Sequence, residues 1–306
     1  MSQRPVSRRG GAVSVAEPPR TPPPRGRRGD RRFGTRRARL ILAVVVAGLA
    51  VVVGVVVRQT HSPAPPSPAP QTACTVASTV PGGSYSITPT QAQNAAIIAA
   101  VALRMGLPDH AVTVALATSL QESQLLNLPY GDQDSLGLFQ QRPSQGWGTS
   151  TQVMDPNYAA SAFYDHLAQL SGWQTMPVTE AAQLVQHSAT PDAYATWETE
   201  ARSLARALTG EVPTGLTCHL DGFSGSAPPP SALLQAALTE MGSQLIGAPV
   251  STKTGWQVAS WAVAHADNYH LNSVSFGGWT WTVASGTWAS ISGSGAGTAQ
   301  DTVVVT

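Results

Sequence analysis

"ATSLQES", residues 117–123, ends an apolar helical pattern with a glutamate. Val112, Leu116 and Leu120 recur at helical spacing and form one face of the expected helix. "SLGLFQQRP", residues 135–143, follows after a short gap and combines glycine, an aromatic residue and two glutamines. Only 11% of the residues are charged, so a glutamate placed between an apolar helix and such a turn is a candidate functional residue.

Glu122 is expected near the negative pole of the helix dipole, which disfavours the ionised carboxylate. Apolar neighbours such as Leu120 and Leu125 add desolvation, which raises the pKa in the same direction. A carboxyl that stays protonated near neutral pH is what a general acid needs to cleave a glycosidic bond. Taken alone, the helix pattern favours the alternative, a surface glutamate on an exposed last turn.

The turn after the helix favours the interpretation of Glu122 as a general acid. Gly137 allows a close backbone approach, and Leu138 and Phe139 are expected to anchor the turn in the core. Gln140 and Gln141 then offer amide donors and acceptors beside the glutamate.

These two motifs resemble the lysozyme-like superfamily, in particular soluble lytic transglycosylases and goose-type lysozymes. The matching residues are Glu122-Ser123 and the run 135–140, and the resemblance covers about residues 85–210. It implies cleavage of the β-1,4 glycosidic bond of peptidoglycan, with Glu122 as general acid and base. It also implies a set of substrate-binding residues: Ser135, Gly137, Gln140, Gln141 and Tyr194.

Tyr194 enters this set through "VQHSATPDAY", residues 185–194, which resembles the later helix that brings a tyrosine near the sugar. A half-buried core aromatic is the alternative for Tyr194. The run from "ATSLQES" through "GLFQQRPSQGWG" also resembles an actinobacterial membrane-anchored family, some members of which are labelled heavy-metal transporters. One predicted span and no ligand cluster give that label no support here.

A second carboxylate separates the two mechanisms. In transglycosylases one carboxyl makes both proton transfers, whereas a hydrolase uses a second carboxylate to activate water or to attack the sugar. Asp132 and Asp134 are the candidates, although "GDQD" is also typical of an ordinary turn. We predict no cofactor and no metal site, because His110, His166 and His187 form no recognisable ligand pattern.

The amino-terminal part predicts a membrane anchor. Residues 40–57 are eighteen apolar residues without a charge, which span about 27 Å as a helix. Twelve arginines against two acids give residues 1–39 a net charge of +10, which predicts a cytoplasmic tail and a chain otherwise outside. A cleaved signal peptide is the alternative for 40–57. The tail is expected to be disordered and topogenic; binding to nucleic acid or anionic lipid is the alternative.

Beyond Arg58, five basic against fifteen acidic residues give a net charge of −10. Because phosphates would be repelled, no nucleic-acid partner is expected outside the membrane. Expected partners are peptidoglycan glycan strands, the membrane through 40–57, and other cell-wall enzymes. In an oxidising compartment Cys74 and Cys218 can pair, which would join the two ends of the central segment.

The predicted fold class is mostly α: a lysozyme-like helical domain at 74–221, with a small loop and hairpin region, and a small α+β domain at 232–306. Residues 58–73 and 222–231 are linkers rich in proline, or in glycine, serine and proline. A capping box at 88–91 opens the first helix, Asp109 caps the second, and 191–208 and 233–245 are helical. "SVSFGGWTWTV" predicts a hairpin about Gly277-Gly278, with Trp279 and Trp281 either in the core or on a sugar platform.

The runner-up function is a glycan-binding or scaffolding module that does not cleave its ligand. A regulator that binds another wall enzyme is the third alternative.

Overall fold

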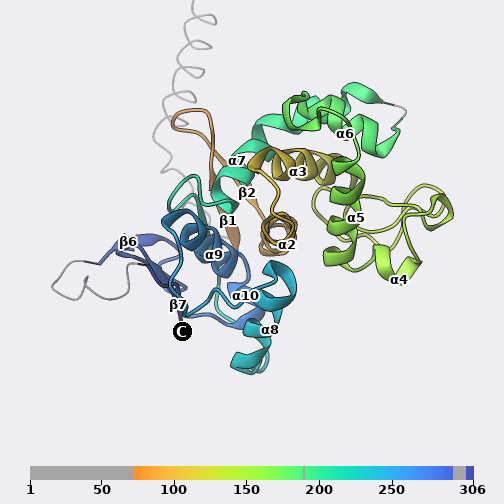
Figure 1. The fold of residues 1–306 in the computed structure, drawn as a ribbon. Coiled ribbons are helices and arrows are strands. Elements are labelled where there is room, and N and C mark those ends of the chain that lie inside the picture. The colour runs from red at the N-terminus through yellow and green to blue at the C-terminus, as the bar shows by residue number, and fades with distance from the viewer. Residues whose placement is uncertain (1–71, 189, 292–300) are drawn as a thin grey trace, which may run out of the picture. The chain divides into compact units, whose positions relative to one another are not determined.

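The computed structural model describes residues 72–188, 190–291 and 301–306. They form a mixed α+β fold, about half helical, with two small antiparallel sheets (Figure 1). The tail at 1–39, the apolar segment at 40–57 and nearly all of the linker at 58–73 lie outside the described residues. Within the part that is described, no helix combines the length and the apolar character needed to cross a membrane.

Helix α2 (Pro89–Arg104) lies at the centre of the helical part. The predicted capping box is confirmed: Thr88 Oγ1 accepts from the Gln91 amide at 3.2 Å, and Gln91 Oε1 accepts from the Thr88 amide at 2.8 Å. The helix ends where Gly106 takes a positive φ of 66°. Its middle is alanine-rich and buried, and these small side chains let α3, α5, α8 and α9 approach it closely.

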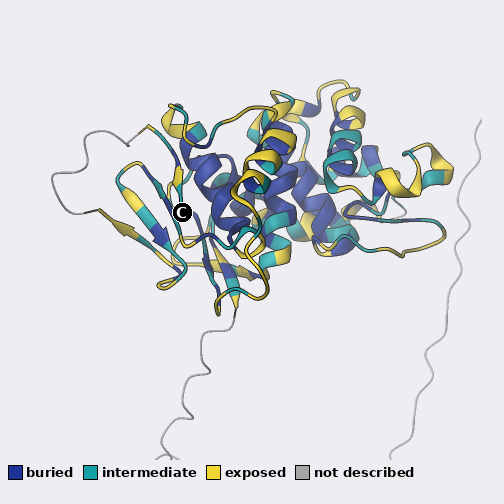
Figure 2. Cartoon of the chain, turned by 90° about the horizontal axis from the view of Figure 1, so that it is seen from below, coloured by how far each residue is buried: buried dark blue, intermediate teal, exposed yellow. Residues whose placement is uncertain are grey.

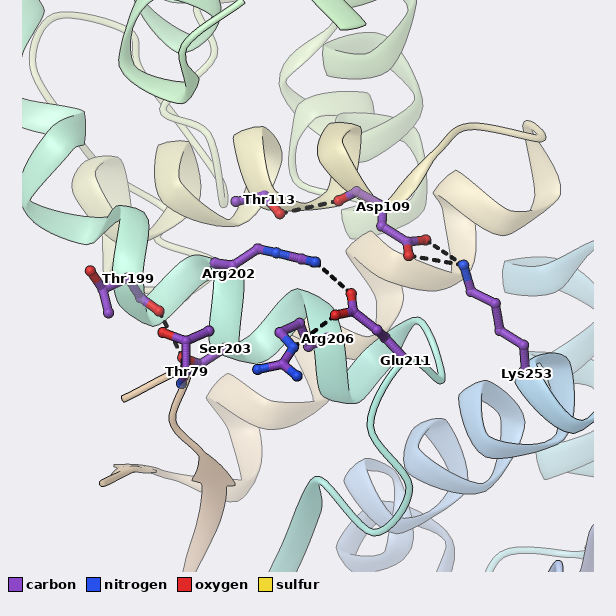
Figure 3. A network of polar contacts seen from close by, with 9 residues as sticks. All are labelled: Thr79, Asp109, Thr113, Thr199, Arg202, Ser203, Arg206, Glu211 and Lys253. Carbon is purple, nitrogen blue, oxygen red and sulfur yellow. Dashed lines mark hydrogen bonds and ion pairs between the residues drawn. The ribbon is translucent and has the colours of Figure 1, made fainter. Parts of the chain in front are cut away.

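The other helices of the central segment follow the predicted order. They are α3 (Asp109–Ser123), α4 (Ser150–Val153), α5 (Pro156–Ala168), α6 (Val178–Gln186) and α7 (Glu198–Leu208), with short 3-10 turns η1 (Pro143–Gln145), η2 (Trp173–Thr175) and η3 (Pro191–Trp197). Two predicted details are wrong. The 191–208 pattern divides into η3 and α7. Asp109 does not cap α3, because its carboxylate binds Lys253 Nζ at 2.9 and 3.0 Å (Figure 3).

The first sheet was not anticipated from sequence. It contains β1 (Ala73–Ala77), β2 (Ser84–Ile87) and β3 (Leu216–His219) in the order β2-β1-β3. Cys74 lies directly opposite Cys218 in the antiparallel register of β1 and β3, and the two form a disulfide. The predicted pairing is therefore confirmed, and it closes the central segment at both of its ends.

The carboxyl-terminal segment contributes three helices and the second sheet. The helices are α8 (Pro230–Met241), α9 (Thr252–Ala264) and α10 (Ala266–Tyr269); the strands are β4 (Ser273–Phe276), β5 (Trp279–Thr282), β6 (Trp288–Ser290) and β7 (Val304–Val305), in the order β6-β5-β4-β7. Helix α8 ends earlier than predicted, because Gly242 caps it with φ 73°. The hairpin about Gly277-Gly278 is confirmed, and both glycines have the positive φ that its tight turn requires.

Two tryptophans of the second sheet bind the backbone of the first one. Trp281 is fully buried and donates to the Cys218 carbonyl at 3.1 Å, and Trp288 donates to the Leu216 carbonyl at 2.8 Å. Trp279, at the hairpin end, is 39% exposed. The core interpretation is thus confirmed for Trp281, which joins the two sheets instead of forming a platform for sugars.

The segments on either side of 222–231 share one hydrophobic core. Helices α8 and α9 pack against α2, and buried residues run without a break from the central segment into the carboxyl-terminal one (Figure 2). Polar contacts reinforce this packing, because Arg104 at the end of α2 donates to the Thr239 carbonyl of α8 and to Ser161 Oγ of α5.

Candidate functional site

Glu122 is the penultimate residue of α3, and an unusual backbone turn follows it. Gln124 and Leu125 have positive φ values of 55° and 57°, a region that non-glycine residues enter at a cost of about 1–3 kcal/mol each. Side chains of α2 hold this turn: Gln91 donates to the Gln124 carbonyl at 2.9 Å, and Asn94 donates to the Leu125 carbonyl at 2.7 Å. The direction in which Glu122 leaves its helix is therefore fixed by the central helix of the fold.

The carboxyl of Glu122 is half-buried and bound only by neutral groups. Tyr194 donates its phenol hydrogen to Glu122 Oε1 over 2.7 Å, and the Gln186 side chain supplies a second hydrogen bond. Burial raises the pKa of Glu122 above its ordinary value, and these two hydrogen bonds act in the opposite direction. The negative end of the α3 dipole favours the protonated form as well. Glu122 thus retains its proton to a higher pH than an exposed glutamate does.

Tyr194 lies in η3 and is fully buried. Burial first, and then the negative charge of Glu122, raise the pKa of its phenol well above the usual range, so it remains a hydrogen-bond donor. Ser188 hydrogen-bonds to the same phenol. The structure therefore places Tyr194 at Glu122 as a buried group that orients the carboxyl, and its predicted role at the sugar stays a prediction.

The turn at 135–141 is fixed against the end of α3. Gly137 has φ 78°, and a β-carbon there would lie 2.3 Å from the Val153 carbonyl oxygen, so the close backbone approach is confirmed. Leu138 and Phe139 are fully buried. The Leu138 carbonyl accepts from Ser123 Oγ at 2.7 Å and from Ser119 Oγ at 3.0 Å.

The predicted sugar-binding residues of this turn mostly bind the protein itself. Gln140 Nε2 donates to the Tyr130 and Gly137 carbonyls, both at 3.3 Å. Gln141 is 2% exposed and donates to the Ala159 carbonyl of α5 at 3.0 Å. Ser135 is buried as well. Gln140 is thus the partly exposed polar side chain of the set, while Gln141 and Ser135 support the turn from within.

Asp134 organises the turn that contains it. It accepts hydrogen bonds from the Ser144 amide at 2.7 Å, Arg142 Nε at 2.9 Å and Ser144 Oγ at 3.0 Å. The backbone bond from Ser144, followed by the Arg142 contact, lowers the pKa of Asp134 from 3.8 to about 2. Asp134 is therefore ionised and already fully bonded, in agreement with the turn interpretation. Asp132 is exposed beside it.

Sequence reasoning missed Gln186, which connects the parts of the site. Its amide donates to the Phe139 carbonyl at 2.7 Å and also hydrogen-bonds Glu122, so α6 joins the turn to the carboxyl. A second unpredicted contact lies beside it, where Trp197 Nε1 donates to Gln121 Oε1 at 2.9 Å. Gln186 stands within the run that pointed to Tyr194, but only the fold places its amide at Glu122.

In residues 72–188, 190–291 and 301–306, no group of three or more His, Cys, Asp or Glu side chains is arranged to hold a metal ion. In the comparisons with known proteins, no family model and no curated protein matches the chain.

Proposed function

We propose that the chain cleaves the β-1,4 glycosidic bond of peptidoglycan, with Glu122 as general acid and base. The observation that carries this proposal is the half-buried Glu122 carboxyl, whose pKa is raised by burial and whose bonded partners, Tyr194 and Gln186, are neutral. A general acid must hold its proton at the working pH and release it in the transition state. A carboxyl without a neighbouring cation meets both conditions.

The proposal extends to the architecture around this carboxyl. Residues 74–221 would have a lysozyme-like fold, with residues 40–57 as a membrane anchor that places this part outside the cytoplasm. The Cys74–Cys218 disulfide supports an oxidising location, because such bonds are rare in reducing compartments. The contact between the end of α3 and the 135–141 turn supports the lysozyme-like arrangement.

The proposed reaction uses one carboxyl twice. Glu122 gives its proton to the glycosidic oxygen as the bond from that oxygen to the sugar carbon breaks and its electron pair goes to the oxygen. The resulting carboxylate then takes a proton from the sugar's own C6 hydroxyl, which closes a 1,6-anhydro ring, or from water. The Tyr194 hydroxyl stabilises the carboxylate between the two transfers. Because Asp134 is bound by Arg142 and Ser144, the one-carboxyl route is favoured.

The test is mass spectrometry of the fragments released from peptidoglycan sacculi by the purified chain with its disulfide intact. We expect 1,6-anhydro products from the wild type and none above background from Glu122→Gln. Glu200→Gln is the matched control, because burial also raises the pKa of Glu200, which lies on α7 without a hydrogen bond from Tyr194. Reducing ends in place of anhydro ends would instead assign the second step to water.

A glycan-binding module without catalysis is the second candidate. It is favoured by Asp134, the candidate second carboxylate, which is already bound by Arg142 and Ser144 and is not free to activate water. Co-sedimentation with sacculi separates the two functions. Binding that survives Glu122→Gln, with no fragment released by the folded wild type, would replace the enzyme proposal by the binding one.

A further inference from the structure

A pocket of about 570 Å³ lies at the opposite ends of the helices that hold Glu122. Its lining includes His110 near the start of α3, Val178 at the start of α6, and Glu198 and Arg202 in the first half of α7. Glu122 and Gln186 stand at the far ends of α3 and α6. The volume falls in the range of about 300–1,000 Å³ that is common for small-ligand sites.

Two nitrogen atoms of the lining residues lack hydrogen-bond partners. His110 Nε2 and Arg202 Nη1 are both buried, and neither is bonded. The rest of each side chain is held in place: Arg202 Nη2 binds Glu211 at 2.5 Å, and the His110 ring stacks on Trp173 at 6.3 Å between centroids (Figure 3 shows Arg202 and Glu211). Buried polar atoms are nearly always hydrogen-bonded in folded proteins. A ligand with an acceptor group in this pocket would supply the partner that these two nitrogens lack.

The pocket also has an acidic side. Glu198 is exposed, lines the pocket and forms none of the ion pairs found among the described residues. The other carboxylate of the lining, Asp109, is neutralised by Lys253 at 2.9 Å. Arg202, which has an unbonded nitrogen, and the unpaired carboxylate Glu198 therefore line the same pocket, and a ligand with both signs of charge complements them.

We propose that this pocket binds a short zwitterionic peptide, with the peptide carboxylate at Arg202 and His110 and the peptide ammonium at Glu198. A planar guanidinium matches a carboxylate well, which favours Arg202 as the principal contact. Met176, Pro177 and Val178 supply an apolar wall for the side chains between the two charged ends. The site is separate from Glu122, and the proposal does not depend on glycan cleavage.

Isothermal titration calorimetry with the full chain tests the proposal, with alanyl-alanine as the probe in its D,D and L,L forms. We expect the free dipeptide to bind at millimolar concentration or below. Amidation of its carboxylate should weaken binding by about tenfold or more, because the amide has no charge and replaces one of the two acceptor oxygens by an NH₂ donor. Preference for the D,D form would point to a cell-wall peptide and preference for the L,L form to an ordinary peptide; either preference supports the site.

A matched pair of variants locates the binding. Arg202→Gln should weaken binding of the dipeptide by about tenfold or more, whereas Arg206→Gln should change it by less than about twofold. Arg206 stands one turn further along α7 and binds the same Glu211 at 2.8 Å, but it does not line the pocket. N-acetylation removes the ammonium of the dipeptide and should weaken its binding to the wild type. Glu198→Gln should bind the free and the N-acetylated dipeptide equally well.

Two results would overturn the proposal. One is no detectable heat from either stereoisomer with wild-type chain that circular dichroism shows to be folded. The other is equal binding of the free and the amidated dipeptide, a comparison made on wild-type protein and so independent of whether Arg202→Gln folds.

Discussion

Glu122 and Glu240 occupy equivalent positions, each one residue before the end of its helix, but their surroundings differ in kind. Glu240 is 5% exposed and accepts from Trp261 Nε1 at 2.6 Å, with His265 Nε2 at 3.4 Å from the same oxygen. Glu122 is half-buried, and its hydrogen-bond donors are a phenol and an amide. The carboxyl at the end of α8 has a neighbouring imidazole, and the one at the end of α3 has none.

This difference separates a carboxyl that joins two helices from the one that we propose to be reactive. Removing one member of a buried acid–imidazole pair leaves the other without compensation, so such a pair holds its elements together. Helices α8 and α9 are joined in this way. A carboxyl surrounded by neutral donors has no such partner to lose, and its protonation can change at small structural cost.

The largest expected effect is on turnover at Glu122. If the carboxyl is the general acid and base, Glu122→Gln should lower the rate of fragment release by about 10²–10⁴-fold, because the amide can neither give nor take the proton. Single-turnover release from labelled sacculi measures this rate. A variant with at least half the wild-type rate would remove Glu122 from the reaction.

The next effect is on stability at Glu240. Glu240→Ala should lower the free energy of unfolding by about 1–3 kcal/mol, because the buried Trp261 Nε1 is left without its acceptor. Chemical denaturation monitored by tryptophan fluorescence measures it. Glu122→Gln is the counterpart and should change stability by less than about 1 kcal/mol. Similar losses at both sites would contradict the distinction between the two carboxyls.

The pH dependence of stability provides a finer comparison. The pKa of Glu122 in the folded protein is raised above 4.5. Its favourable contribution to the free energy of unfolding is therefore complete below pH 4.5 and is lost as pH rises through the folded pKa. Glu122→Gln removes this loss, and the variant should gain stability relative to wild type across that window. The measurement is the urea midpoint of unfolding of both proteins at several pH values. A difference between the two midpoints that stays constant with pH would show that the pKa of Glu122 is not raised.

Tyr194→Phe should have a smaller effect, visible in the pH profile. Loss of the phenol donor removes a hydrogen bond that stabilises the ionised carboxyl, so the pKa of Glu122 should rise further. The basic limb of the activity profile should move to higher pH, with a rate loss at the optimum of about tenfold or less. An unchanged basic limb would show that the limb belongs to another group.

Asp134→Asn should have the smallest effect, confined to acid. The pKa of Asp134 is lowered to about 2, so its contribution is present above 3.8 and is lost as pH falls from there to about 2. Wild type and variant should therefore converge in stability at the acid end of a thermal melting series. Divergence there would contradict the bonded arrangement with Arg142 and Ser144.

The features that could be predicted from sequence are those that local chemistry determines. The capping box at Thr88, the two-glycine hairpin and the helical position of Glu122 each depend on residues within a few positions of one another. The β1–β3 sheet joins strands of five and four residues that are far apart in the chain, too short for a periodic signal. Gln186 reaches Glu122 only because α6 packs against α3. A buried Gln141 and a buried Tyr194 likewise follow from packing that no short motif encodes.

The Cys74–Cys218 bond also determines how the molecule carries tension. Its two ends are 144 residues apart, so a pull applied before Cys74 and after Cys218 passes through the disulfide and leaves the intervening helices unloaded. The segment between the two cysteines, which has a contour length of about 500 Å, therefore cannot be extended by this pull. In a pulling experiment this length should appear only after reduction, so the Glu122 site lies in a segment that a pull on its two ends cannot unfold while the bond is intact.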